Sequence, residues 1–126
     1  MTVLRMTVAG GPTQAGTLDD PFDWDAFRAW TVAGFVAGDS VYAESGDYFP
    51  TSSPSGADGT DAAPLSLIGV TNLSDLTSYA QGDDRPLFDF RPAAGNYFSF
   101  DNSWRVGNLR SLADTGFGAI RVDNYG

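Results

Sequence analysis

The side chains of this chain that can do chemistry are almost all carboxylates. The sequence holds fifteen Asp, one Glu and seven Arg, and it has no Lys, His or Cys. Glycoside hydrolysis needs two carboxylates at a defined separation, one of them with a raised pKa. Asp89, Asp101 and Asp123 are candidates because they could project from neighbouring strands. The arginines near them in the sequence are Arg91, Arg105 and Arg121. Outward charges that keep a sheet soluble are the commoner origin of such a pattern, so we predict no catalytic residue.

Two clusters of carboxylates raise the question of calcium. Asp58 and Asp61 lie in a Gly-rich loop, and four more carboxylates fall in residues 19–25. These four are Asp19, Asp20, Asp23 and Asp25. Oxygen ligands suit Ca²⁺, but neither spacing is that of an EF-hand loop. Carboxylates at a helix start already interact well with the helix dipole. We therefore predict no metal site and no cofactor, with Ca²⁺ as the weaker alternative.

The run "NYFSFDNSW" is the densest aromatic stretch of the chain. Strand alternation places about half of its rings inside a fold, so the others must face outward. Exposed aromatic rings stack on sugars and anchor protein interfaces. We predict a glycan or partner contact made by Tyr97, Phe98, Phe100, Asp101, Trp104 and Arg105.

The charge balance limits the classes of partner. The net charge is −9, and no basic stripe is present to neutralise phosphates, so nucleic acid is not an expected partner. An acidic surface also disfavours anionic membranes. No apolar run approaches the length that spans a bilayer, and the first residues lack the pattern of a secretion signal. Proteins and glycans remain as partners.

The first 36 residues read as a strand followed by a helix. Leu4, Met6 and Val8 alternate with polar residues, which is the pattern of a half-buried strand. Acidic residues then open a helix predicted over residues 23–33, with Phe27 and Trp30 on its apolar face.

Residues 37–126 read as seven short strand-like runs separated by Gly, Asp, Asn, Pro and Ser. This texture predicts an all-β fold, either a sandwich or a solenoid. Val41, Leu67, Phe88 and Ile120 are candidates for equivalent inward positions in coils of about 20 to 25 residues.

Short motifs along the chain share an order with a known family. They are "GTLDDPF", "GDSVY", "GDY", "GTDAAPLSL", "WRVGNL" and "GAIRV". In this order they resemble the opening of right-handed parallel β-helix proteins of the pectate-lyase-like superfamily. The resemblance covers nearly the whole chain and departs most at residues 74–85 and 91–96, which we interpret as loops. The matching positions are Gly16, Thr17, Pro21, Phe22, Gly38, Asp39, Val41, Tyr42, Gly46, Tyr48, Gly59, Thr60, Pro64, Leu65, Trp104, Val106, Leu109, Gly118, Ile120 and Val122.

The resemblance implies an all-β fold, namely a short right-handed parallel β-helix, or solenoid, with an N-terminal capping α-helix. Residues 1–126 would form one domain, with the strand and capping helix in residues 1–36 and three to four coils in residues 37–126. Phe27 and Trp30 would hold the helix across the open edge of the first coil. The C-terminal coil is predicted to be uncapped, because nothing comparable follows Tyr125.

The resemblance also bears on catalysis. In characterised relatives a Lys or Arg base abstracts a sugar proton, while calcium held by Asp carboxylates neutralises the uronate. This chain has no lysine, and an arginine needs unusual help to lose its proton. Lyase activity by this chain alone is therefore not expected.

We predict a non-catalytic structural or interaction protein, a decoration or spike-type component of a virion or cell-surface assembly. Its location would be the virion, such as a phage particle, or the extracellular surface. Its partners would be other proteins or further copies, bound through the uncapped C-terminal coil, or a glycan. Two alternatives remain: the N-terminal portion of a pectate-lyase-like polysaccharide lyase or depolymerase, and a small glycan-binding module that uses Tyr97, Asp101 and Trp104.

Overall fold

The computed structural model describes most of the chain. The described residues are 2–54, 59–60, 62–93, 95–96, 98–100, 103–113 and 120–122, with the backbone alone at 98–100 and 120–122. The elements in chain order are β1 (Val3–Met6), α1 (Trp24–Val32), β2 (Ser40–Glu44), β3 (Asp47–Tyr48), β4 (Leu65–Val70), the 3-10 turn η1 (Gly82–Asp84), β5 (Leu87–Asp89), β6 (Phe98–Phe100), β7 (Trp104–Gly107), β8 (Arg110–Leu112) and β9 (Ile120–Val122).

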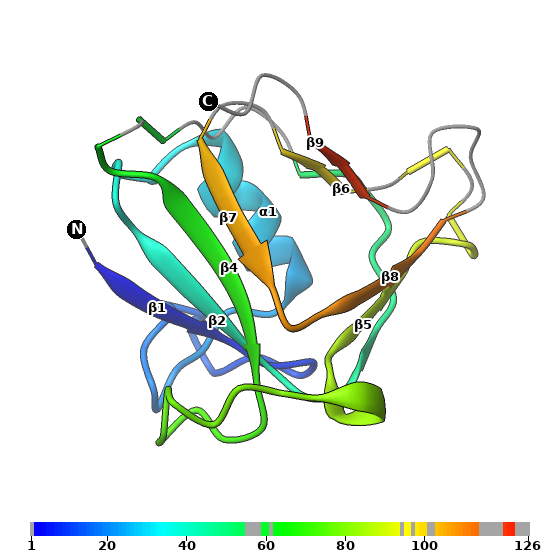
Figure 1. The fold of residues 1–126 in the computed structure, drawn as a ribbon, viewed down its shortest axis with the longest axis horizontal. Coiled ribbons are helices and arrows are strands. Elements are labelled where there is room, and N and C mark those ends of the chain that lie inside the picture. Colours follow the sequence, from blue (N-terminus) through cyan, green and yellow to red (C-terminus); the bar gives the residue numbers. More distant parts are fainter. Residues whose placement is uncertain are drawn as a thin grey trace.

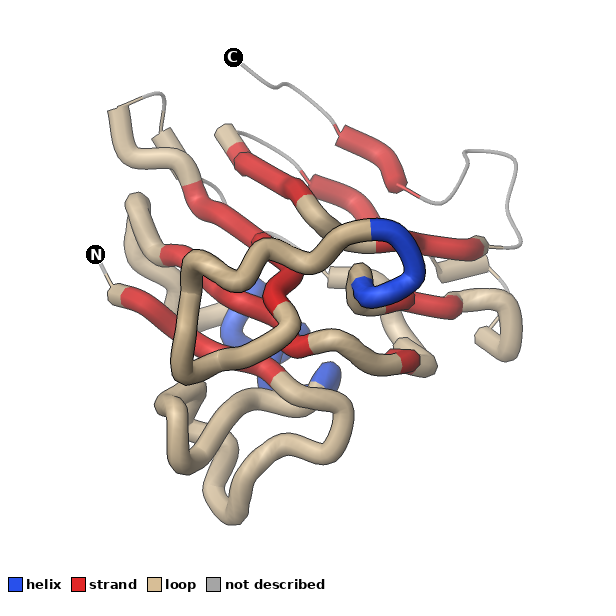
Figure 2. The backbone as a smooth tube through the Cα atoms, turned by 60° about the horizontal axis from the view of Figure 1, so that its bottom comes forward, coloured by secondary structure: helices blue, strands red, loops and turns tan. Residues whose placement is uncertain are grey.

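The described strands form three sheets in which every neighbouring pair is parallel. Their orders are β1-β2-β4-β7, β3-β5-β8 and β6-β9. The strands of each sheet run side by side in Figure 2. Parallel neighbours cannot be joined by a tight turn, so the chain leaves one sheet and passes through other segments before it returns.

Alternation decides which side chains of the four-stranded sheet face the core. Val41 and Leu67 lie opposite one another on β2 and β4, and both are fully buried. Ser40 and Ser66, one position earlier on the same strands, are only half-buried. The period-2 pattern of the sequence therefore becomes an apolar inner face and a polar outer face.

Helix α1 forms where the sequence predicts it. Asp23 is its N-cap, and a carboxylate oxygen of Asp23 accepts a hydrogen bond of 2.9 Å from the backbone N–H of Ala26. Asp25 adds a carboxylate in the first turn, where the helix dipole favours negative charge. Gly34 follows the helix at a positive φ of 113°, a conformation that glycine adopts without strain. The predicted helix over residues 23–33 is confirmed.

The aromatic face of α1 is part of the protein core. Phe27 and Trp30, both predicted on this face, are 0% and 7% exposed. Trp24 contacts Phe88 of β5 at a ring distance of 5.7 Å, and Trp30 meets Trp104 of β7 at 6.3 Å. In Figure 1, α1 is seen between the four-stranded sheet and the β5-β8 pair. One hydrophobic cluster joins the helix to two of the sheets.

The expected fold class, an all-β right-handed parallel β-helix or solenoid with a capping helix, is wrong. The structure is a small mixed α/β fold whose parallel strands are divided among separate sheets and whose helix supplies core side chains. The intervals between opposed strands are also unequal: Val3 lies opposite Ser40, Ser40 opposite Ser66, and Ser66 opposite Arg105. The first and third intervals exceed the expected coil of about 20 to 25 residues.

The solenoid prediction relied on Val41, Leu67, Phe88 and Ile120 occupying equivalent positions, and the structure does not place all four in one sheet. Val41 and Leu67 do share a sheet, in register. Phe88 instead pairs with Tyr48 in the second sheet, and Ile120 pairs with Phe98 in the third. Alternation shows that a side chain faces inward, but it does not show which strand lies beside it.

The outer side of β1 is closed by the chain itself. The backbone N–H of Arg5 donates to Gly16 O at 2.8 Å, and Phe22 N–H donates to Arg5 O at 2.9 Å. Thr7 N–H donates to Phe22 O at 2.9 Å. The segment before α1 therefore satisfies the edge of β1 that would otherwise remain open to pairing.

Gly69 gives a test of this packing. A Cβ at Gly69 would lie 1.9 Å from the backbone oxygen of Asn108, so Gly69→Ala must push the loop after β7 away from β4. We expect Gly69→Ala to lower the free energy of unfolding by about 3 kcal/mol. The control is Gly82→Ala, where a Cβ meets nothing within 4 Å and the cost is only that of the positive φ, about 1 kcal/mol. Urea unfolding of both variants measures the difference, and equal losses would contradict the contact.

Candidate functional site

The six residues predicted to contact a glycan or partner do not share one strand. Trp104 and Arg105 lie on β7, whereas Phe98 and Phe100 lie on β6 in another sheet. Tyr97 and Asp101 fall outside the described residues, as do the side chains of Phe98 and Phe100. The structure therefore places side chains for only two of the six, and these two are neighbours on β7.

Trp104 and Arg105 face opposite sides of β7. Trp104 is half-buried, and its ring meets Trp30 edge-on, at an angle of 86° between the ring planes. Arg105 is exposed and lies in register with Ser66, which itself lies in register with Ser40. Trp104 thus contributes to packing, and Arg105 is the member of the pair that is exposed to solvent.

A groove of about 270 Å³ lies beside Arg105 on the outer face of the four-stranded sheet. Its lining residues are Gly38, Ser40, Ala62, Ala63, Pro64, Ser66 and Arg105. The space exists because the outward residues in register with Arg105, Ser66 on β4 and Ser40 on β2, have small side chains. Among the described residues, Arg105 makes no ion pair. The groove therefore offers a cation and two hydroxyls, a set suited to a carboxylate or another anion.

Asp89, a candidate for a catalytic pair, belongs to a structural ion pair. Its buried carboxylate accepts hydrogen bonds from Arg91 Nε at 2.9 Å and Nη2 at 2.8 Å, and from the Arg91 backbone N–H at 3.1 Å. The hydrogen bonds from the Arg91 side chain lower the pKa of Asp89, although burial acts in the opposite direction. A general acid needs a raised pKa, so Asp89 has the wrong shift for that role. Asp101 and Asp123 lie outside the described residues.

Two of the carboxylates named as candidate calcium ligands accept hydrogen bonds from backbone N–H groups. Asp20 accepts hydrogen bonds from the Thr13 hydroxyl and from the backbone N–H groups of Thr13, Gln14 and Ala15. The Thr13 hydroxyl is the main reason that the pKa of Asp20 is lowered. Asp23 caps α1. Within the described part of the chain, no three acidic side chains gather in a way that could hold a metal ion. Asp58 and Asp61 fall outside that part.

A second cleft, lined by aromatic and acidic side chains, was not among the sites predicted from the sequence. It has a volume of about 280 Å³ and is lined by Val8, Asp23, Trp24, Asp25, Asp47, Tyr48, Phe49 and Thr51. The adjacent Tyr48 and Phe49 were a usable signal, since neighbours on a strand face opposite sides and one of the rings had to be exposed. Phe49 is that ring, at 61% exposure, whereas Tyr48 is 2% exposed.

Comparisons with protein-family models, curated proteins and solved structures find no match for this chain. Nothing in them identifies a pectate-lyase-like protein, so the resemblance stays a prediction. In the described residues, no helix has both the length and the apolar character needed to cross a membrane.

The Asp89–Arg91 pair predicts a defined pH dependence. Asp89→Asn keeps the shape but loses the charge, and we expect it to lower the free energy of unfolding at neutral pH by about 2 kcal/mol. The pKa of Asp89 in the folded chain lies below its ordinary 3.8. The wild type should therefore exceed Asp89→Asn in free energy of unfolding by the full amount at pH values above 3.8. The advantage disappears as the pH falls through the lowered pKa, because the folded carboxylate then becomes protonated.

Urea unfolding at a series of acidic pH values measures this effect. The wild type and Asp89→Asn should converge in stability as the pH falls. Asp83→Asn is the matched control, because the fully exposed Asp83 lies 3.8 Å from Arg110 and should contribute almost nothing. A stability difference between wild type and Asp89→Asn that stays constant through the acidic range would contradict the ion pair.

Proposed function

We propose that this chain is a non-catalytic structural protein that assembles with other protein chains through the side of the fold formed by β7, β8 and β9. One observation carries the proposal, namely that the two edges of the four-stranded sheet differ. The outer side of β1 is bonded to residues 16–22 of the same chain, whereas β7 is the outermost described strand at the other edge. Strands β8 and β9 are likewise outermost among the described strands of their sheets.

The hydrogen-bond pattern of β7 identifies the backbone groups that point away from β4. Leu65 N–H donates to Ser103 O at 3.0 Å, which fixes the alternation along the β4–β7 ladder. In a parallel ladder, successive residues point their backbone groups to opposite sides. The N–H and C=O of Val106 therefore face away from β4. An outward N–H and C=O on an outer strand are a template for pairing with another chain.

The closed edge at β1 limits the form that such an assembly takes. Head-to-tail stacking would require β7 of one copy to meet β1 of the next, and residues 16–22 already occupy that side of β1. Two β7 edges can still meet about a two-fold axis, which gives a closed pair instead of a filament. We take a second copy as the partner. The net charge of −9 opposes this pairing, so salt should strengthen it.

The other functions expected from the sequence have less support. A lyase portion acting on uronates would need both cationic groups and a base at its substrate site. Among the described residues, the Phe49 cleft is lined by three Asp and by no Arg, and the groove beside Arg105 has a cation but no carboxylate. A virion or extracellular location stays a prediction, because it followed from the resemblance and from the fold class that the structure corrects.

Light scattering coupled to size-exclusion chromatography tests the assembly. We expect the mass to rise from 13.4 kDa toward twice that value with increasing protein and salt concentration. Arg105→Glu places a negative charge on β7 itself and should weaken association about tenfold. Arg28→Glu on α1 is the matched control, since it changes the net charge equally at an exposed site remote in sequence from β7.

Hydrogen exchange supplies an independent readout of the same edge. The amide of Val106 should exchange quickly in the monomer and become protected on association, while the amide of Leu67 stays protected in both states. A monomer at every protein and salt concentration contradicts the proposal. A Val106 amide that is already protected in the monomer contradicts it as well.

A further inference from the structure

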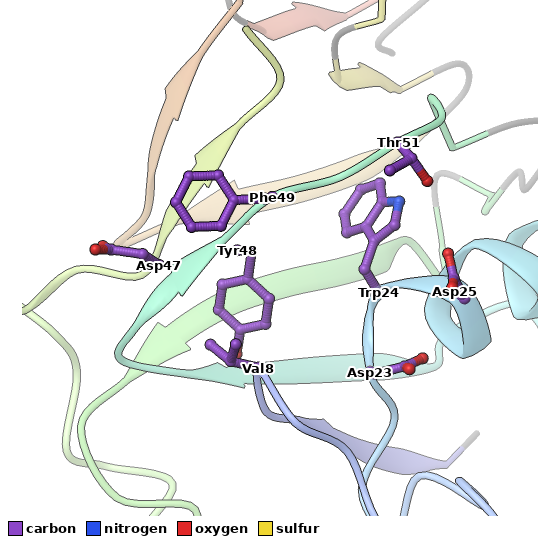
Figure 3. A pocket seen from close by; sticks show the side chains of 8 residues that line it. All are labelled: Val8, Asp23, Trp24, Asp25, Asp47, Tyr48, Phe49 and Thr51. Carbon is purple, nitrogen blue, oxygen red and sulfur yellow. The ribbon is translucent and has the colours of Figure 1, made fainter. Parts of the chain in front are cut away.

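The cleft beside Phe49 presents one exposed aromatic ring above a fixed floor. Tyr48 and Phe49 are consecutive, so the ring of Tyr48 turns into the core while that of Phe49 turns outward. In Figure 3, Phe49 and Trp24 lie on either side of Tyr48, and Asp23 and Asp25 lie at the Trp24 end. Asp47 lies at the opposite end, with its carboxylate directed away from the cleft.

The floor of the cleft is held by the core and does not need a ligand to form. The Tyr48 ring stacks on Phe88 at 4.5 Å, and its hydroxyl donates to the backbone oxygen of Glu44 at 2.8 Å. Burial raises the pKa of Tyr48 far above its usual range, and so keeps the phenol neutral. Trp24 Nε1 donates to Ser52 O at 3.2 Å, which fixes the ring that forms the other wall. A preformed site loses little conformational entropy on binding.

The walls of the cleft combine an apolar ring with hydrogen-bond acceptors. Phe49 is 61% exposed and, within the described part of the chain, makes no ring contact. Asp25 is exposed, and the cap bond fixes the carboxylate of Asp23 at the start of α1. Carboxylates only accept hydrogen bonds, so a matching ligand must donate them.

The negative charge of the lining residues further limits the chemical class of ligand that the cleft can bind. Of the eight described residues that line the cleft, three are Asp and none is Arg, and Asp23 and Asp25 are the two whose carboxylates lie at the Trp24 end. A ligand that bears carboxylate, sulfate or phosphate would meet only like charge there, as well as the net charge of −9. A purely apolar ligand would bury carboxylates without giving them a donor, which is costly. The volume of about 280 Å³ is close to the lower limit for small-molecule sites.

We propose that this cleft binds a saccharide that carries no acidic group, with an apolar C–H face of one sugar ring on Phe49 and its hydroxyls donating to Asp23 and Asp25. This site goes beyond the assembly role and does not depend on β7. A neutral sugar and an amino sugar share the required chemistry, because both have an apolar face and several donors. The carboxylates favour them and disfavour a uronate.

An NMR titration with three kinds of oligosaccharide tests the site. The probes are a neutral gluco-oligosaccharide, a chitosan oligosaccharide and an oligogalacturonate. We expect the amide signals of Val8, Asp25 and Phe49 to shift with the neutral or the amino probe and to stay unchanged with the uronate. Binding of the uronate alone, or of none of the three probes, would overturn the proposal.

Two pairs of variants locate the contact. Phe49→Ala should weaken binding about fivefold to tenfold, whereas Tyr79→Ala, which removes a similarly exposed ring outside the cleft, should leave it unchanged. Asp25→Asn should weaken binding, and Asp19→Asn, at an exposed site outside the lining, should not. All four sites are exposed, so thermal unfolding should confirm that each variant is folded. Equal effects within each pair would overturn the assignment to this cleft.

Discussion

The burial of Trp24 is the interaction on which the rest of the structure depends. Its ring meets Phe27 on its own helix at 5.3 Å and Phe88 and Phe90 at 5.7 and 5.5 Å. Its indole N–H donates to Ser52 O, so the one polar atom of the ring is satisfied near the surface. One side chain thus joins α1, the second sheet and the segment after β3. The same ring forms a wall of the Phe49 cleft, which links the core to the proposed saccharide site.

The parallel arrangement of the strands explains where the surface features arise. Each return to a sheet needs a long connection, and these connections carry the turns and loops between the sheets. The connection from β1 to β2 contains both the segment that closes the β1 edge and the helix that fills the core. No corresponding segment covers β7 among the described residues. The asymmetry of the two edges is therefore a consequence of chain order, and the assembly proposal rests on it.

The acidic composition has two separate physical roles in this fold. Several carboxylates accept hydrogen bonds from backbone N–H groups, as Asp20 does in its loop, Asp23 at α1 and Asp39 before β2. Asp89 instead pairs with Arg91, and its pKa is lowered accordingly. The carboxylates that remain exposed, such as Asp25, set the sign of the surface charge. An abundance of Asp therefore says more about how loops are held than about catalysis.

The sequence by itself determined the local structure, because capping, alternation and turn residues act between near neighbours. It correctly predicted the helix at residues 23–33 and a strand at β1, and it placed Phe27 and Trp30 on one apolar face. The expected inward position of Val8 was wrong, because β1 ends at Met6 and Val8 is 49% exposed. Only the tertiary structure decided which strands pair, since Val41, Phe88 and Ile120 have similar patterns yet belong to three sheets. It also decided that Trp104 packs on Trp30 while Phe49 stands exposed beside Asp23 and Asp25. Pairing and clefts depend on contacts between residues far apart in the chain, which no local pattern encodes.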